Sequence, residues 1–489
     1  MPPERPNVLF LCSDQHGYRY TGFGGHPHVE TPNLDRLAAR GTTFANAYCS
    51  SPVCVPSRAS LMTGVFPSDV GSYCNSTVWD GSVPTWGSRL RAAGYHTWAT
   101  GKLDLDPTHE IGFDERDTHH GHASNPDVTS LFRRPTCYRM SERPGVDGRP
   151  REERHGDADL AANAREFLTE AAPPDQPWAA WVGFSMPHPS FTALEGYYDR
   201  YHPRKVEPPN VPPGHLEDQH LVFEQLRRFK RLGVPVDERR IRRARAAYYG
   251  MISELDEYIG SLLDTLADAD MAEDTVVIYT SDHGEMLGEH SLWYKNTLYE
   301  DAVHVPLTMA GPGIPDGQVV DAPVGHVDLV SSLTAWADAD APTPERGCSL
   351  DPFLGGEGTH DGVAYAENHS EGNCTGSFMI RRDDWKYIHV TGYDDLLFDL
   401  AADPHELDNR IDDPDLEDVR ADLRSLLFDR VEPTVVTSDA FAAQETLRDR
   451  LAAQQGPNGF FDTLRGRFGD GQARVLTERC TGAWPADTD

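Results

Sequence analysis

The chain is poor in lysine and in long apolar runs, and its cysteines are not paired in sequence. Five of its 489 residues are lysines, whereas the other 39 of its 44 basic residues are arginines. Acidic residues number 78, so the formal net charge is −34. Nucleic-acid binding requires basic patches, and this composition therefore argues against a nucleic-acid partner.

The excess of acid predicts a surface that is heavily hydrated and self-repelling, and that depends on salt for screening. Arginine in place of lysine on such a surface is similar to the composition of proteins from salt-loving microbes with a salty cytosol. We therefore expect a halophilic protein.

The remaining absences concern membranes and disulfides. No apolar run is long enough to span a bilayer, and the first residues do not form a signal peptide of the usual kind. The eight cysteines form no Cys-x-x-Cys pair and show no zinc-site spacing. We therefore expect a cytoplasmic protein with reduced thiols and no membrane partner, whose oligomeric state the sequence does not indicate.

Apolar and amphipathic segments alternate along most of the chain. Buried strands are predicted at 7–13, 96–100, 178–184, 275–280 and 305–309. Helices are predicted at 31–40, 85–93, 157–171, 238–267 and 328–336. This βα alternation predicts an α/β fold in residues 1–375, with a large, mostly parallel but mixed sheet sandwiched by helices.

The character of the chain changes near residue 376. Short alternating strands are predicted at 377–381, 385–390 and 395–398, and a helix capped by Asp413 is predicted near 414–428. Residues 376–489 are therefore expected to form a smaller antiparallel α+β subdomain. Its acidic tail beyond Val431 suggests no function.

The most specific motif is Ser51-Pro-Val-Cys-Val-Pro-Ser-Arg-Ala-Ser-Leu-Met-Thr-Gly64. Pro56 suits a first helical turn, so a short helix is predicted over 57–62, with Cys54 just before its N-terminus. The free N–H groups and partial positive charge at that end favour an anionic nucleophile and substrate, and Arg58 adds a fixed cation. Taken alone, Cys54 is more simply interpreted as a small buried hydrophobic residue.

Two acidic pairs directly follow predicted strands: Asp14-Gln15 and Asp282-His283. Ligand sites of open α/β sheets gather at the carboxyl ends of strands. Two carboxylates that meet there need a compensating cation, because uncompensated charges are costly to bury. An isolated Asp-His pair is more simply a turn or a helix cap. In combination with the Cys54 motif, the two pairs favour a divalent metal site.

The Cys54 motif and the sequence Ser281-Asp-His-Gly-Glu285 resemble the signatures of the type I sulfatases, formylglycine-dependent members of the alkaline phosphatase superfamily. The resemblance covers roughly residues 7–313, with gaps in two irregular stretches. It implies an alkaline phosphatase-like fold. It also implies that a formylglycine-generating enzyme oxidises Cys54 to formylglycine, the nucleophile.

The same resemblance implies one divalent ion, bound by Asp14, Gln15, residue 54, Asp282 and His283. Calcium is the usual ion of the family. An imidazole ligand in place of an oxygen shifts the preference toward Mn²⁺ or a similar ion, so both stay open.

Further catalytic roles are implied for Arg58, Lys102, Lys295 and His188. Arg58 would orient the nucleophile, and Lys102 and Lys295 match sulfate-binding lysines. His188 would donate a proton to, or hydrogen-bond, the departing oxygen. A single lysine is more simply a solvated surface residue, but two of only five lysines stand at these places. For His188 the simpler interpretation is a loop residue between prolines.

Other motifs point to subgroups of the family. Gly101-Lys-Leu-Asp104 lacks the histidine usual in common sulfatases and resembles arylsulfatase K-like enzymes, which are glucuronate 2-sulfatases. Asp104 is therefore expected to bind substrate. Asn75 resembles substrate-facing asparagines of choline sulfatase-like enzymes, and a turn asparagine is equally consistent. The Asp-Gln and Asp-His pairs resemble those of phosphonate monoester hydrolases and choline sulfatases.

The sequence thus predicts a sulfuric ester hydrolase acting on a sulfate ester of a sugar or uronate. One alternative is a phosphonate monoester or phosphodiester hydrolase with the same nucleophile. A second is a non-catalytic, anion-binding relative in which Cys54 is not modified.

The irregular stretches 117–157 and 202–238 are expected to form loops over the active site. An anionic substrate would need a local positive pocket within the acidic surface. Arg133-Arg134 and Arg227-Arg228, which lie in these stretches, are candidates, although surface arginine of a halophilic protein is the simpler interpretation.

Overall fold

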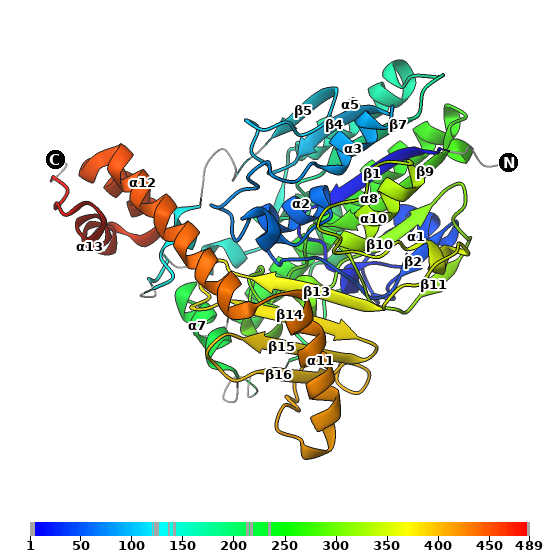
Figure 1. Cartoon of the computed structure of the whole chain (residues 1–489). Helices are drawn as coiled ribbons and strands as arrows, with labels where there is room; N and C mark the ends of the chain where they lie inside the picture. Colours follow the sequence, from blue (N-terminus) through cyan, green and yellow to red (C-terminus); the bar gives the residue numbers. More distant parts are fainter. Residues whose placement is uncertain are drawn as a thin grey trace.

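The computed structural model describes residues 5–119, 121, 127–134, 137–139, 143–211, 215, 219–232 and 236–486. Its largest unit is an eight-stranded sheet with the order β11-β2-β10-β9-β1-β7-β4-β5 (Figure 1). In chain order these strands are β1 (Asn7–Ser13), β2 (Thr42–Phe44), β4 (His96–Lys102), β5 (Glu115–His119), β7 (Trp178–Gly183), β9 (Thr275–Ser281), β10 (Leu307–Ala310) and β11 (Gln318–Val320). Among these eight, β10 alone runs against its neighbours. The mixed, mostly parallel α/β fold is confirmed.

Helices cover both faces of this sheet, because its strands carry apolar side chains on both faces, as β1 illustrates. Its alternate residues Phe10 and Leu11 point into two different hydrophobic cores, as the two-residue repeat of a strand requires. On the Phe10 face lie α2 (Cys54–Thr63), α3 (Trp86–Ala92) and α10 (His326–Trp336). On the Leu11 face lie α1 (Pro32–Ala39), α5 (Asp157–Glu166) and α8 (Glu238–Asp268).

The predicted strands and helices of this region are present, with small shifts at their ends. One shift concerns the helix predicted over 57–62, because α2 begins earlier and includes Cys54 as its first residue. The Ser57 N–H donates to the Val53 carbonyl at 3.0 Å, which closes a helical turn around Cys54. Pro56 fits this first turn because its missing N–H would have no partner there. The helix therefore begins three residues earlier than predicted, and Cys54 is its first residue rather than one that precedes it.

A second, antiparallel sheet follows in the C-terminal part. It has the order β13 (Val363–Asn368), β14 (Ser377–Arg382), β15 (Trp385–Val390) and β16 (Leu396–Asp399), and α11 (Glu417–Arg430) packs on one of its faces. Its other face joins the core that contains Phe10. The smaller antiparallel subdomain is confirmed. Strand β13 was not predicted and precedes residue 376, and the division of the chain at 375/376 stays a prediction.

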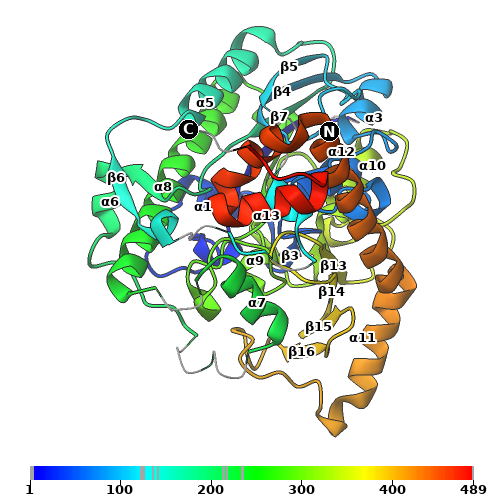
Figure 2. The same ribbon diagram turned by 90° about the vertical axis from the view of Figure 1, so that its left-hand side faces the viewer.

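Two helices, α12 (Pro433–Phe468) and α13 (Asp470–Thr481), occupy the segment described from sequence only as an acidic tail. Helix α12 breaks at Gly456, whose φ of 65° lies in the left-handed region that glycine adopts at low cost. Beyond the break, Phe460, Leu464 and Phe468 pack with the short helix η3 (Val128–Leu131). In Figure 2, α13 and the last part of α12 lie across the middle of the face turned to the viewer, and the first part of α12 runs down the right-hand side toward α11.

The other strands and α-helices are smaller. They are β3 (Ala47–Tyr48) paired with β12 (Val324–Gly325), β6 (Arg149–Arg151) paired with β8 (Thr192–Leu194), α6 (Glu195–Tyr201), α7 (Leu221–Phe229) and α9 (Glu300–Val303). Helix α7 lies where a loop was predicted, because Val222, Leu226 and Phe229 form a buried apolar face. Parts of both irregular stretches fall outside the described residues. Within the part of the chain that is described, no helix has the length and apolar character needed to cross a membrane.

Candidate active site

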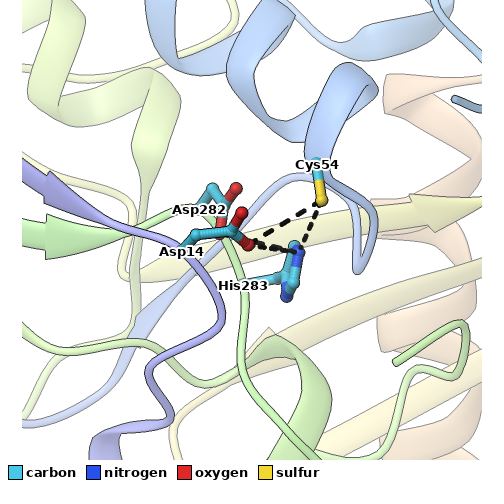
Figure 3. A group of neighbouring side chains, drawn as sticks. All are labelled: Asp14, Cys54, Asp282 and His283. Atoms are coloured by element: carbon cyan, nitrogen blue, oxygen red, sulfur yellow. Dashed lines mark hydrogen bonds and ion pairs between the residues drawn. The ribbon is translucent and has the colours of Figure 1, made fainter. Parts of the chain in front are cut away.

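Four of the residues predicted to bind metal meet at the carboxyl end of the central strands (Figure 3). Asp14 follows β1, and Asp282 and His283 follow β9. Because Ser13 is paired in register with Ser281, the two aspartates leave the sheet side by side. Cys54 approaches from the start of α2. One ligand atom from each of the four lies within 4.8 Å of the other three, and all four side chains are buried.

This donor set fits a divalent cation. His283 Nδ1 lies 3.0 Å from the Gly284 carbonyl, which leaves Nε2 as the ligand atom, 3.3 Å from Cys54 Sγ. In the structure a positive charge already lies among the donors. The Lys295 ammonium contacts Cys54 Sγ at 2.8 Å, His283 Nε2 at 2.9 Å and Gln15 Oε1 at 3.0 Å. Two buried carboxylates with imidazole and sulfur beside them need such compensation.

Gln15 is held beside the donors in an unusual backbone conformation. Its φ of 74° is left-handed, which costs a non-glycine residue on the order of 1 kcal/mol or more. The backbone N–H donates to Asp282 Oδ1 at 3.0 Å, and the Tyr248 hydroxyl donates to the Gln15 carbonyl at 2.6 Å. Its Nε2 donates to Glu285, so Oε1 is the atom that faces the site. This geometry suits the predicted fourth side-chain ligand.

The electrostatics of Cys54 are dominated by cations. Burial and the Asp14 carboxylate act to raise the pKa of the thiol, but Lys102, Lys295 and His283 outweigh them and hold it well below its usual range. The site therefore stabilises negative charge at residue 54. At the same helix end, Asn75 Oδ1 accepts a hydrogen bond from the Val55 N–H at 3.1 Å.

Lys102 and Asp104 form a buried pair at the base of the site. The Lys102 ammonium contacts Asp14 and lies 3.3 Å from Asp104 Oδ2. Burial lowers the pKa of Lys102, but Asp14 and the Cys54 thiolate raise it by more, so the side chain stays charged. Asp104 is fully buried behind this ammonium. Its position suits an ion-pair partner of Lys102, and its predicted contact with substrate stays a prediction.

Arg58 lies behind the donors and fixes the ends of three strands. Its Nε donates to Asp282 Oδ2 at 2.8 Å, and both side chains are fully buried. Its two Nη atoms donate to the carbonyls of Lys102 and Ser13, at 2.8 and 3.4 Å. Arg58 therefore acts through Asp282 and the strand ends, as a positioning residue.

A cavity of about 330 Å³ opens beside the cluster. Of the predicted residues, Gln15, Asn75, His188 and Lys295 line it. His188 Nδ1 lies 2.7 Å from the Pro189 carbonyl, which leaves Nε2 available to a departing oxygen. Sequence reasoning missed the other polar side chains of this wall, which are Asp127, Arg139, Lys230, Tyr294, Asn296, Glu371 and Arg467.

The two arginine pairs that the sequence suggested as a positive pocket, Arg133-Arg134 and Arg227-Arg228, lie outside the cavity lining. Arg133 is buried and donates to the carbonyls of Asn373 and Thr375, at 2.6 and 2.7 Å. Arg134 stacks on Phe441, and Arg227 and Arg228 belong to α7. None of these four arginines is among the described residues that line the cavity. The cations that do line the cavity are Arg139, Lys230, Lys295 and Arg467.

Comparisons with known proteins agree with this geometry. Residues 6–339 match the family model described as Sulfatase, and residues 288–432 match the model described as N-sulphoglucosamine sulphohydrolase, C-terminal. The chain is 32% identical over 431 residues to the choline-sulfatase of Rhizobium meliloti (strain 1021), over 85% of this chain and 84% of that protein. It is 30% identical over 431 residues to arylsulfatase K of Homo sapiens, over 83% and 78%. The phosphonate monoester hydrolase of Agrobacterium radiobacter matches with a TM-score of 0.72 and 26% identity, over 87% of this chain and 95% of that one.

Proposed function

The chain belongs to the sulfatase family and is a sulfuric ester hydrolase, and we propose that residue 54, as formylglycine, is its nucleophile toward the sulfate ester of a sugar or uronate. The observation that carries the proposal is the convergence of Cys54 with Asp14, Asp282 and His283 beside a buried lysine. These groups bring together a nucleophile position, a cation site and an anion-binding ammonium, and the lysine that supplies the ammonium lines the adjacent cavity.

Each part of the site has a definite task in this reaction. A hydrated formylglycine would supply a hydroxyl that attacks sulfur, and a divalent ion held by Asp14, Gln15, residue 54, Asp282 and His283 would withdraw charge from the sulfate. Lys102 and Lys295 bind sulfate oxygens and stabilise the charge that develops on them. Both ammonium groups are buried, so their attraction for the anion is stronger than it would be in water.

Other residues position the nucleophile and assist the leaving group. His188 Nε2 donates a proton to the departing oxygen. Asn75 fixes the first turn of α2, and Arg58 fixes Asp282. Calcium or manganese as the ion, maturation by a formylglycine-generating enzyme and a cytoplasmic location accompany this proposal as predictions.

The choice of a sugar or uronate rests on the cavity and on the relatives. A cavity of about 330 Å³ lies at the small end of the roughly 300–1,000 Å³ typical of ligand pockets, which suits one sugar residue. The curated relatives include both a choline-sulfatase and arylsulfatase K. Choline is a cation, whereas four cations, Arg139, Lys230, Lys295 and Arg467, outnumber the two acids, Asp127 and Glu371, in this cavity wall, which favours an anionic substrate.

A phosphonate monoester hydrolase is the second candidate. It is favoured by the Asp14-Gln15 and Asp282-His283 pairs and by the structural match to such an enzyme. Both reactions need the same nucleophile, cation and lysines, so the cluster does not discriminate between them.

Paired kinetics discriminate between the candidates. With residue 54 matured, we expect kcat/KM for an aryl sulfate to exceed that for the matching aryl phosphonate monoester. Both esters share one leaving group, so the comparison isolates the group being transferred. Phosphonate turnover faster by more than about tenfold in kcat/KM would overturn the sulfatase proposal in favour of the second candidate.

Replacing Lys295 by alanine should lower kcat by about 10²–10³-fold, the loss typical when one preorganised donor to a transition-state oxyanion is removed. The measurement is steady-state turnover of an aryl sulfate at saturating substrate. Lys205→Ala is the matched control, because Lys205 is exposed and paired with Glu30 on the surface. An unchanged kcat in Lys295→Ala would show that the ammonium does not contact the reacting group.

A further inference from the structure

Arg467 differs from the other cations of the active-site cavity in having no committed partner. The Lys230 ammonium donates to Asn296 Oδ1 at 2.8 Å, and Arg139 Nη1 lies 3.9 Å from Glu371 Oε1. Lys295 is bound within the donor cluster. Arg467 lines the same cavity and is exposed, and within the described part of the chain the structure gives its guanidinium no hydrogen bond or ion pair.

The position of Arg467 is nevertheless fixed by its neighbours on α12. Phe468 and Leu464 are buried in the core that α12 shares with η3, and the Phe468 ring meets the Phe132 ring edge-on at 5.5 Å. Arg467 lies in the last turn of the helix, beside Phe468. The helix thus holds the base of this side chain at the wall of the cavity while its guanidinium stays free to move.

The two acids of the cavity wall make their hydrogen bonds and close ion pairs with groups other than Arg467. Asp127 Oδ1 accepts from the Thr129 N–H at 3.1 Å and from the Thr129 hydroxyl at 2.7 Å, which makes it the cap of η3. Glu371 Oε2 accepts from the Ser130 hydroxyl at 3.1 Å, while its other oxygen faces Arg139. Burial acts to raise the pKa of Asp127, but Arg139, Thr129 and Arg467 together lower it, so the charge of Arg467 is felt inside the cavity.

We infer that Arg467 binds a second anionic group of the substrate, a carboxylate or a second sulfate, and so selects sulfate esters that carry two negative charges. The inference rests on the proposed function. Lys295 lines the cavity and, together with Lys102 beside Asp14, would hold the reacting sulfate. Arg467 offers the planar fork of donors that matches a carboxylate or sulfate. In a chain of net charge −34, an uncommitted cation at this wall also offsets the repulsion of a dianionic substrate.

This second-anion site belongs to a segment that the family match does not reach. The two matched family models end at residues 339 and 432, whereas α12 and α13 span Pro433–Thr481. The sulfate-cleaving centre therefore lies in the shared part of the chain, and the selecting residue lies in its C-terminal helices.

The test compares three matched substrates: a uronate O-sulfate, a disulfated neutral sugar and the corresponding monosulfated neutral sugar. Arg467→Ala should raise KM about tenfold for the substrate that carries the recognised second anion and leave the neutral monosulfate unchanged. The uronate and disulfate arms show whether carboxylate or sulfate is recognised. Arg467→Lys should restore part of the loss, because it keeps the charge without the fork.

Arg465→Ala is the matched control. Arg465 lies in the same helical turn, but it pairs with Asp462 at 3.4 Å and is not among the residues that line the cavity. Equal losses on all three substrates, or no loss on any, would overturn the inference. If the wild type cleaves none of them, the proposed function fails instead, and calorimetric binding of the same compounds to wild type and Arg467→Ala still decides whether Arg467 discriminates.

Discussion

Cys54→Ala is expected to abolish turnover, with kcat on an aryl sulfate at least about 10⁴-fold below that of the matured wild type. The estimate follows from the loss of a covalent nucleophile, which in other hydrolases costs on the order of 10⁴–10⁶-fold. Lys295 and His283 contact this one atom, Cys54 Sγ, at 2.8 and 3.3 Å, and Lys102 adds to the positive charge that lowers its pKa. The remaining groups would still bind the sulfate but would have nothing to attack it with.

The measurement pairs kinetics with mass spectrometry of the peptide that contains residue 54. An aldehyde at that residue in the active wild type would identify the nucleophile. Cys348→Ala is the control, because Cys348 is a partly exposed free thiol that belongs neither to the donor cluster nor to the residues that line the cavity, and its removal should leave kcat unchanged.

Two outcomes would contradict this mechanism in different ways. A fully active protein in which every Cys54 is an unmodified thiol would make the thiolate itself the reacting group, which its lowered pKa allows. A protein with an unmodified Cys54 and no activity after exposure to its maturation enzyme would favour the non-catalytic, anion-binding alternative.

The cluster around Cys54 was predictable from sequence because each member lies at the end of a recognisable element. Asp14 and Asp282 directly follow apolar runs that form neighbouring strands, and Cys54 lies two residues before Pro56, which marks the first turn of a helix. Adjacent parallel strands carry their terminal residues to the same edge of the sheet. The local sequence pattern was therefore enough to predict that these residues lie close together.

The outer wall of the cavity was not predictable in this way. Arg139, Glu371 and Arg467 come from segments more than 90 residues apart in sequence, and only the packing of α12 on η3 brings them to one cavity. The segment of α12 and α13 contains six acidic and six basic residues, and its five glycines and Pro457 obscured the helical pattern. Strand β5 was missed for another reason: its residues are mostly exposed at the sheet edge and show no apolar alternation.

Lysine usage was a signal that sequence reasoning used only in part. Lys102, Lys230, Lys295 and Lys386 are 7%, 3%, 7% and 0% exposed, so four of the five lysines are buried in a chain that uses arginine on its surface. Lys386 pairs with Glu300 and Glu406 at 2.9 and 2.8 Å. Every lysine other than Lys205 therefore marks a specific buried contact, and Lys230 could have been assigned to the site from this scarcity.

Asp282→Asn is expected to lower kcat by roughly 10³-fold and to destabilise the protein by about 3–5 kcal/mol. Asp282 serves two partners at once: it is one donor of the proposed metal site, and its Oδ2 accepts the Arg58 Nε at 2.8 Å. The neutral amide weakens the attraction for a divalent ion. It also leaves the fully buried Arg58 guanidinium without its counter-charge, the situation in which breaking a buried ion pair is costly.

The two effects separate when melting temperature is measured with and without a chelator. Wild type should melt lower in chelator, because a bound ion stabilises only the folded state, and activity should return with Ca²⁺ or Mn²⁺, whichever the site prefers. Asp282→Asn should melt below wild type in both conditions, because Arg58 stays unpaired, and its melting should no longer respond to chelator. Asp264→Asn is the control, because it breaks an exposed ion pair with Arg36 at 2.8 Å. It should change neither the melting temperature nor kcat. If the melting of Asp282→Asn still responds to chelator as wild type does, the ion binds elsewhere, and Asp282 serves Arg58 alone.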